Sequence, residues 1–317
     1  VAQSNRWWWW WAWNATDKQS YIYKFGRNGP NDKPAYVATG QIDGWILDQF
    51  SMDEHDGYLR VASTDNRWNW DESTGERTAE GGNHVTVLEQ RGGQLHEVGA
   101  VRNLAPGERI YATRMMGDKG YVVTFRQVDP LFTLDLSNPK NPRLMGELKV
   151  NGFSSYIHPL GEDHLMTFGQ DADDEGRVEG VHLQIFDVSD MSNPTRTYQE
   201  KITTGEWSSW SEAMWNHHAF TYHPGRDMLA FPINIYQWTE FGNQNFSGLL
   251  VYKANAENGF ERVGMVNHAD LVNDNNHWWT SIRRSTFIED NVYSFSEVGL
   301  KVNKLYDPSN NLATVEF

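Results

Sequence analysis

The sequence predicts an all-β fold, and within that class a β-propeller built from four-stranded antiparallel blades. Short runs of β-branched and aromatic residues recur along the chain, separated by Gly, Pro, Asn and Asp at intervals of roughly ten residues. Long amphipathic helical patterns do not occur. The runs group into units of four strands over roughly 40 to 60 residues, and that period is the sequence sign of a propeller.

Six units divide the chain, and we mark the strands of each unit a to d in chain order. The first unit holds only the end of strand b, strand c at 20–25 and strand d at 35–42. The strands expected in the five full units are 47–52, 58–63, 84–90 and 95–101; 109–115, 120–126, 131–136 and 143–150; 155–158, 164–169, 182–188 and 195–202; 217–222, 228–235, 248–253 and 261–267; and 282–288, 292–296, 299–304 and 312–317. We predict one propeller domain over 1–317, made of a partial blade at 1–44 and full blades at 45–104, 105–151, 152–204, 205–270 and 271–317.

Two internal signatures support this alignment. Strand c is followed by a turn rich in Asp, Asn and Pro at 135–142 in the third unit and at 187–194 in the fourth. Strand d carries a glycine in four of the units: Gly40, Gly99, Gly146 and Gly264.

The first seven residues resemble 61–68, which follow strand b of the second unit. If the two stretches are copies of one element, Val1 lies inside a strand whose beginning precedes it. We therefore expect the missing N-terminal part of the same precursor, or a partner chain, to complete the first blade. The complete assembly would then have about six to eight blades, within the range of known propellers.

Composition excludes several classes of function. The formal net charge is −15 and the chain shows no cluster of Lys and Arg, so we expect no nucleic-acid partner. No apolar run is long enough to span a membrane, and no phosphate loop or dinucleotide fingerprint predicts a nucleotide cofactor. Cysteine is absent, which excludes disulfides and thiolate metal sites.

The stretches 50–62, 105–111, 120–131 and 156–160 carry a more specific signal. They resemble the secreted β-propeller family of bacteria and archaea, which is distantly related to the WD-repeat propellers. The resemblance covers nearly the whole chain and is strongest between residues 45 and 190. It implies a propeller that is extracellular, on the cell surface or periplasmic, with a precursor longer than this chain. It supplies no catalytic residues.

Tryptophan is the most unusual feature of the composition, with 15 residues. In a propeller the b–c and d–a connections lie on one face. The tryptophans expected in b–c connections are Trp7, Trp8, Trp9, Trp10, Trp11, Trp13, Trp68, Trp70 and Trp238. Those expected in or beside d–a connections are Trp45, Trp207, Trp210, Trp215, Trp278 and Trp279.

We therefore expect all the indoles on the same face. Indole combines an apolar ring with an N–H donor, which suits sugar rings, aromatic ligands, cations and protein partners. The sequence thus predicts a surface that recognises a glycan, an aromatic ligand or a protein partner. The alternative is that the indoles pack into a small core under long loops.

Histidines accompany these tryptophans. The set His217, His218, His268 and His277 is a candidate transition-metal site, for copper or for zinc, iron or nickel. Neighbouring residues on a strand point to opposite sides, so His217 and His218 can share one ion only if the backbone turns there. Solvated or hydrogen-bonded histidines are the alternative. If the metal were copper, nearby indoles could carry oxidising equivalents, as in an oxidoreductase.

A second candidate metal site lies in the fourth b–c connection. Asp171, Asp173 and Glu175 alternate before a glycine, as oxygen ligands do at the start of a calcium loop. The Glu that closes an EF-hand is missing, because His182 occupies its position. A solvated acidic loop is the alternative.

The sequence leaves three functional hypotheses. The first is a secreted or surface propeller that binds a ligand or partner through its Trp- and His-rich face. The second is a metal-dependent oxidoreductase, with copper as the expected metal, whose site lies under these loops. The third is a structural fragment of a larger propeller assembly. Charged residues in strands a and b, Arg283 and Arg284 among them, are expected to form salt bridges between blades.

Overall fold

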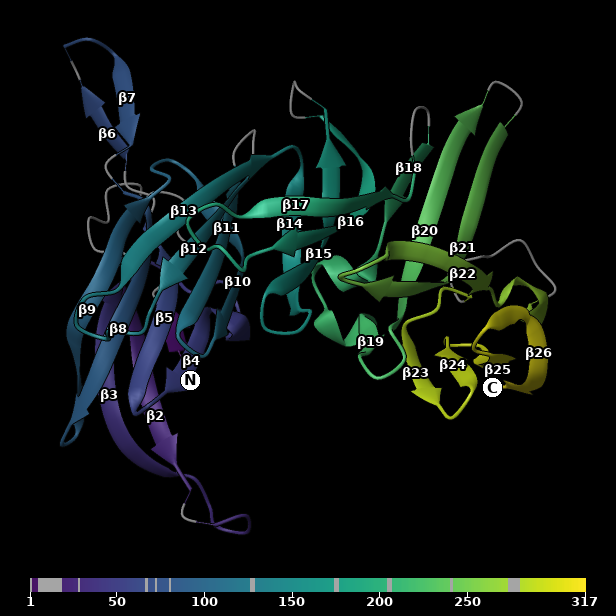
Figure 1. Ribbon diagram of the computed structural model, residues 1–317, viewed down its shortest axis with the longest axis horizontal. Coiled ribbons are helices and arrows are strands. Elements are labelled where there is room, and N and C mark those ends of the chain that lie inside the picture. The colour runs from purple at the N-terminus through teal and green to yellow at the C-terminus, as the bar shows by residue number, and fades with distance from the viewer. Residues whose placement is uncertain are drawn as a thin grey trace. The chain divides into compact units, whose positions relative to one another are not determined.

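A computed structural model describes residues 2–4, 19–27, 29–65, 68–71, 73–79, 81–125, 129–173, 177–203, 207–239, 242–272 and 280–317 (Figure 1). The chain has an all-β fold of four-stranded antiparallel sheets, as a propeller requires. It divides into two compact units, Val1–Val150 with Met191–Asn193, and Asn151–Asp190 with Pro194–Phe317. That the blades form one domain over 1–317 stays a prediction.

The first unit holds the partial blade and two full blades. The partial blade consists of β1 (Ala2–Ser4), β2 (Gln19–Gly26) and β3 (Ala35–Asp43). The next blade consists of β4 (Met52–His55), β5 (Tyr58–Thr64), β8 (Asn83–Arg91) and β9 (Gln94–Leu104), with a hairpin of β6 (Trp68–Asp71) and β7 (Glu76–Ala79) between β5 and β8. The third blade consists of β10 (Arg109–Met116), β11 (Lys119–Phe125), β12 (Asp129–Asp135) and β13 (Arg143–Val150). A single parallel pair, Thr39 with Gln94, joins the first two blades into one sheet.

The second unit holds the remaining blades. The fourth consists of β14 (Phe153–Pro159), β15 (His164–Ala172), β16 (Val178–Asp187) and β17 (Thr195–Lys201). The fifth consists of β18 (Trp207–Trp210), β19 (Thr221–His223), β20 (Met228–Thr239), β21 (Gly242–Asn255) and β22 (Gly259–Val266). The sixth consists of β23 (Arg284–Ile288), β24 (Asn291–Phe295), β25 (Gly299–Lys304) and β26 (Asp307–Glu316).

The strand-d glycines leave room for the following blade. A Cβ atom on Gly99 would lie 2.4 Å from the carbonyl oxygen of Pro139, in the c–d turn of the third blade. A Cβ atom on Gly264 would lie 3.0 Å from Cδ of Pro308, at the start of β26. A side chain at either position would push the neighbouring turn away. The repeated glycine is therefore a requirement of packing between blades within each unit.

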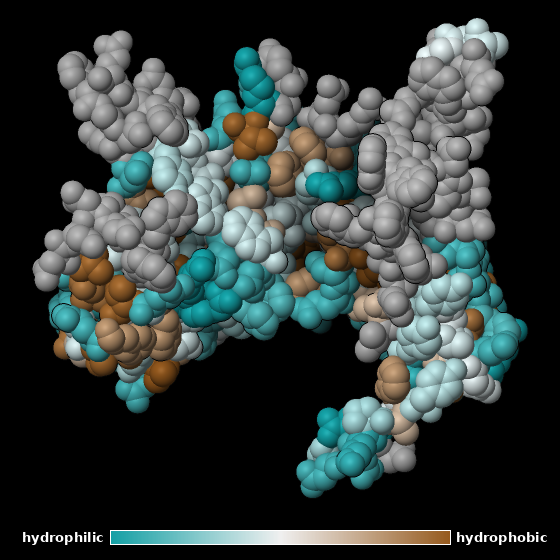
Figure 2. All heavy atoms as spheres, turned by 180° about the vertical axis from the view of Figure 1, so that it is seen from behind, coloured by the Kyte–Doolittle hydropathy of each residue, from teal (hydrophilic) through white to brown (hydrophobic). Residues whose placement is uncertain are grey.

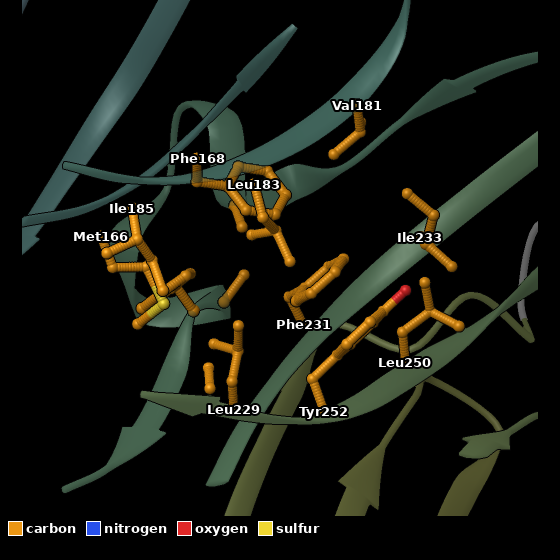
Figure 3. Packing of buried hydrophobic residues seen from close by; sticks show 14 of the residues in the cluster. Met166, Phe168, Val181, Leu183, Ile185, Leu229, Phe231, Ile233, Leu250 and Tyr252 are labelled. Carbon is orange, nitrogen blue, oxygen red and sulfur yellow. The ribbon is translucent and has the colours of Figure 1, made fainter. Parts of the chain in front are cut away.

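The core of the second unit lies between the fourth and fifth blades (Figure 3). The ring of Phe231 on β20 is 4.9 Å from that of Phe168 on β15 and 5.9 Å from that of Tyr252 on β21. All three side chains are almost completely buried. Burying each one stabilises the unit by about 1.5–3 kcal/mol.

The second blade begins later than the sequence predicts. The expected strand at 47–52 is wrong, because Gln49–Ser51 forms a 3-10 turn, η1, and β4 starts only at Met52. The carboxylate of Asp48 accepts hydrogen bonds from the backbone N–H groups of Phe50 (2.9 Å) and Ser51 (3.2 Å). This cap satisfies backbone donors locally, and so it competes with strand pairing.

The fifth blade departs most from the prediction, since the expected strand a at 217–222 is wrong over most of its length. Strand a consists of two pieces, β18 and β19, which both pair with β20. Between them lie the 3-10 turns η2 (Glu212–Met214) and η3 (His217–Ala219). The stretch 231–233 of β20 therefore has no strand-a partner, and Pro232 lies in its middle.

Pro232 suits this gap because proline has no N–H to donate to a neighbouring strand. Its carbonyl oxygen accepts a hydrogen bond from the hydroxyl of Ser211 (2.5 Å). A side chain of the inserted segment thus replaces the missing strand at this point.

The last blade presents apolar side chains to water. Figure 2 shows them gathered at the left of that view. The exposed large apolar residues on and just after β26 are Leu312, Val315 and Phe317.

Candidate ligand-binding site

The candidate site is the segment 211–220, which interrupts strand a of the fifth blade. Two capping side chains fold it. The hydroxyl of Ser211 accepts a hydrogen bond from the N–H of Ala213 (3.1 Å), and the amide oxygen of Asn216 accepts one from the N–H of His218 (3.3 Å). Ser and Asn stabilise turns in this way because their short side chains reach backbone donors two residues on. These two hydrogen bonds give the segment a defined backbone conformation.

The site contains two stacked indoles, of which Trp210 is half-buried and Trp215 is exposed. The rings of Trp210, at the end of β18, and Trp215, just after η2, are 5.6 Å apart and inclined by 17°. Nε1 of Trp210 donates a hydrogen bond to the hydroxyl of Tyr236 on β20 (3.0 Å), which holds the Trp210 ring in place. Trp215 remains 65% exposed. One face of its ring covers Trp210, and the other is open to water.

A network of charged side chains lies one turn before Trp215. Oε1 of Glu212 accepts hydrogen bonds from the amide of Asn216 (2.8 Å) and from Nη1 of Arg284 (2.8 Å). Oε2 accepts one from Nη1 of Arg283 (3.1 Å). Burial raises the pKa of Glu212, but the hydrogen bond and charge of Arg284 outweigh it and hold the pKa below its usual range. The carboxylate is thus ionised at neutral pH and fixes both guanidinium groups.

The two adjacent histidines lie in η3 and not on a strand. Their ring centres are 4.0 Å apart, and Tyr156 of β14 stacks on His217 at 6.5 Å and 24°. The backbone therefore turns where the two histidines lie. His218 is exposed and His217 is half-buried.

The structure does not bring the other described histidine of the predicted metal set to this pair. His268 is buried in the sixth blade, with Nδ1 2.7 Å from the hydroxyl of Ser296 and Nε2 2.9 Å from that of Ser294. His277 lies outside the described residues. Among the side chains that the structure describes, no three His, Asp or Glu residues converge as metal ligands. A transition metal at His217 and His218 stays a prediction.

The acids of the predicted calcium loop are paired with protein cations. Asp171 lies in β15 and not in a loop, because β15 extends to Ala172. It is buried, forms an ion pair with Lys201 and lies 3.6 Å from Nδ1 of His182. Burial raises the pKa of Asp171, but hydrogen bonds to His182 and Lys201 have the larger effect and lower the pKa to about 2. The prediction of a calcium ion stays untested.

Asp173 likewise accepts hydrogen bonds from the N–H (2.8 Å) and Nε (2.6 Å) of Arg177. Glu175, the third predicted ligand, lies outside the described residues.

The remaining tryptophans are placed as follows. Trp7, Trp8, Trp9, Trp10, Trp11, Trp13, Trp278 and Trp279 lie outside the described residues. The backbone of Trp68 and Trp70 forms β6, inside the predicted b–c connection. Trp45 forms an isolated bridge with Thr64.

One placement was wrong. Trp238 lies in β20, because β20 and β21 continue as one hairpin to the pair Thr239 with Gly242. Trp207 and Trp210 lie beside the d–a connection, as expected, in β18, because strand a starts earlier than its local pattern predicts.

The repeated four-stranded antiparallel blades define a β-propeller. In its fifth blade, the segment 211–220 is inserted into strand a. The family model described as "Beta propeller domain" matches residues 1–307, and the chain belongs to this family. This match confirms the resemblance to a β-propeller family that the sequence shows.

Two archaeal relatives are similar in sequence. An uncharacterized protein of Methanocaldococcus jannaschii is 34% identical over 261 residues, which are 82% of this chain and 35% of that protein. An uncharacterized protein of Archaeoglobus fulgidus is 44% identical over 179 residues, which are 56% of this chain and 25% of that protein. The chain thus spans a minor part of each relative.

Two solved structures of Sqt1 from Chaetomium thermophilum resemble the chain. One is Sqt1 alone, with a TM-score of 0.39 and 9% identity, covering 84% of this chain and 71% of that chain. The other is Sqt1 bound to the N-terminus of the ribosomal protein L10, with a TM-score of 0.40 and 10% identity, covering 84% of this chain and 74% of that chain. In the described part of this chain, no helix has the length and apolar character needed to cross a membrane.

Proposed function

We propose that this β-propeller binds a ring-shaped ligand, a glycan or an aromatic molecule, on the open face of Trp215. One observation carries the proposal: Trp215 is 65% exposed, yet it is held in place by stacking on Trp210. A ring that is ordered before binding loses little conformational entropy on binding. Its apolar face suits the C–H face of a sugar or a second aromatic ring.

The neighbouring polar groups supply hydrogen-bond donors for the same ligand. Arg283 and Arg284 use Nη1 to bind Glu212, and their side chains are 52% and 40% exposed. Each guanidinium carries five N–H donors, so both retain donors that can reach ligand oxygens. Stacking on Trp215 with hydrogen bonds to guanidinium groups is the combination that fits a hydroxyl- or carboxylate-bearing ring.

A binding panel tests the proposal. The full chain is tested on an array of neutral and acidic oligosaccharides and against soluble aromatic compounds, and the Kd of each hit is measured by calorimetry. We expect Trp215→Ala to weaken binding about 5- to 150-fold, because loss of a stacking ring costs about 1–3 kcal/mol.

Tyr306→Ala is the matched control, because Tyr306 is an exposed aromatic residue (53%) in the sixth blade. The Kd of this variant should stay within about twofold of the wild-type value, because Tyr306 lies between β25 and β26 and is not part of the proposed site. No binding to any member of the panel, or equal weakening by both substitutions, would contradict the proposal.

A location outside the cytoplasm is part of this proposal, and the family resemblance supports it. Labelling of intact source cells with an antibody against the propeller, compared with permeabilised cells, tests this part separately.

A further inference from the structure

A cavity lies far along the chain from Trp215, in the first unit. It has a volume of about 740 Å³ and is lined by residues at the end of β9, by the segment after it and by β13. Its apolar lining residues include Leu104 and Phe132, which are almost completely buried, and Leu144, which is 45% exposed. This volume falls within the range of ligand-binding clefts, about 300–1,000 Å³.

One wall of the cavity is a strained backbone segment. Asn103 and Ala105 both have left-handed backbone angles, with φ of 58° and 43°. Alanine rarely adopts this conformation because its Cβ clashes with the backbone. The amide of Asn83 holds the segment by donating to the carbonyl oxygen of Leu104 (3.0 Å). Strain that the surrounding structure maintains in this way is typical of functional sites.

A β-bulge in β13 shapes the opposite wall. Thr133 of β12 pairs with Gly146, whereas the next residue, Leu134, pairs with Leu144. Met145 is therefore an extra residue, and the alternation of side chains shifts there. As a result, Leu144 lines the cavity together with residues 147 and 149 of the same strand. Met145 is 38% exposed but does not line it.

Both bordering strands have open edges. In the described part of the chain, β13 is the last strand of its sheet, and β9 pairs with β3 at one residue pair only. Such edges present backbone N–H and C=O groups that can pair with another extended chain.

The charged residues that line the cavity are two cations and two anions: Arg102, Lys149, Glu108 and Glu147. Arg102 contacts Glu97 (2.6 Å) and Asp43 (3.5 Å), and Lys149 contacts Glu147 (3.4 Å). The carboxylate of Glu108 accepts a hydrogen bond from the neutral hydroxyl of Thr124 (2.5 Å). The charges of the lining sum to zero, which favours an uncharged occupant.

From these features we infer that the cavity binds an extended, uncharged peptide segment, which adds as a strand to the edge of β13. Main-chain hydrogen bonds give such a complex its affinity, and alternate side chains give it specificity. Here every second side chain of the peptide packs over Leu104, Phe132 and Leu144. This site is separate from the one at Trp215 and does not depend on it.

Peptide selection with the full chain tests the inference. The probe is a displayed library of random peptides with the length of β13, 8 residues, and selected peptides are measured by fluorescence anisotropy. We expect peptides without net charge that carry apolar residues at every second position. Selection of charged peptides, or of none that bind, would overturn the inference.

Two neighbouring substitutions locate the binding site. Leu144→Glu places a charge in the cavity and should weaken binding at least tenfold. Met145→Glu adds the same charge to the same strand outside the cavity and should leave the Kd nearly unchanged. Both residues are exposed, so both variants should fold, which circular dichroism verifies. Equal effects of the two substitutions would refute the site.

Backbone methylation of the peptide tests strand addition. N-methyl groups on alternate residues remove every second N–H donor. One register should abolish binding, because those N–H groups pair with β13, and the other register should be tolerated. If both registers bind alike, the peptide does not add as a strand.

Discussion

Acidification should destabilise the sixth blade through a single buried histidine. His268 is completely buried, and each of its ring nitrogens lies within hydrogen-bonding distance of a serine hydroxyl. Burial, assisted by the cation of Lys301, lowers the pKa of His268 to about 4, although Asp270 opposes the shift. Lys301 is itself fixed, since Nζ donates to the carbonyl oxygen of Asn267 (3.1 Å) and to the carboxylate of Asp270. The folded blade therefore requires the neutral imidazole.

The magnitude follows from the difference between the two pKa values. The ordinary value is 6.5 and the folded value is about 4, and each unit corresponds to 1.36 kcal/mol, which gives about 3 kcal/mol. Because the folded-state pKa is lowered, this stabilisation is fully present above pH 6.5. It is lost as the pH falls from 6.5 towards 4, where the unfolded chain binds the proton first.

Hydrogen exchange of the β24 and β25 amides, corrected for intrinsic rates, measures this stability locally. The matched variant is His268→Asn, which keeps a donor and an acceptor but does not titrate. Between pH 7 and 4 the protection free energy of the wild type should fall by about 3 kcal/mol more than that of the variant. The acidic residues titrate in both proteins, so their contribution to the protection free energy cancels in the difference. Parallel pH curves for the two proteins would refute the reasoning.

Three further substitutions have defined outcomes. Phe231→Ala leaves a cavity in the core of the second unit and should lower the free energy of unfolding by about 3–5 kcal/mol, measured by urea denaturation. Gly44→Ala should lower the melting temperature of the first unit, because φ is +84° and the new Cβ would lie 2.4 Å from the carbonyl oxygen of Thr64; an unchanged melting temperature would contradict this. Asp171→Asn should cost about 2 kcal/mol at neutral pH, since the pKa of Asp171 is lowered from 3.8 to about 2; the difference from the wild type should vanish as the pH falls from 3.8 towards 2, which denaturation at several pH values checks.

The blades were predictable because their signals are local. The period-2 runs, the Asp- and Pro-rich turns after strand c and the strand-d glycines each lie within a few residues. The structure confirms the all-β fold and the order of the strands. Strand ends were less predictable, since pairing with a neighbour extends a strand beyond its own pattern, as in the hairpin that contains Trp238.

The candidate site was predictable in part. The residues Trp210, Trp215, His217 and His218 stand out by type alone. Glu212 and Tyr236 do not, because their roles depend on contacts with residues 284 and 210, far away in the sequence or on another strand. Arg283 and Arg284 were expected to form salt bridges, and they do, with Glu212.

One signal for the interrupted strand was present in the sequence. Pro232 lies within a run that otherwise predicts a central strand, and proline is confined to places where a partner strand is absent or irregular. Its position marks the gap opposite 231–233.

That gap separates two roles within one insert of the fifth blade. Because β18 and β19 are both anchored on the continuous strand β20, the blade's hydrogen-bonded frame does not depend on the exposed side chains of the insert, Trp215 and His218. Ala213, Ala219 and Phe220 of the same insert are buried in the core of the second unit, so they have to be kept. A change of specificity is therefore expected at the exposed positions, while the buried positions maintain the fold.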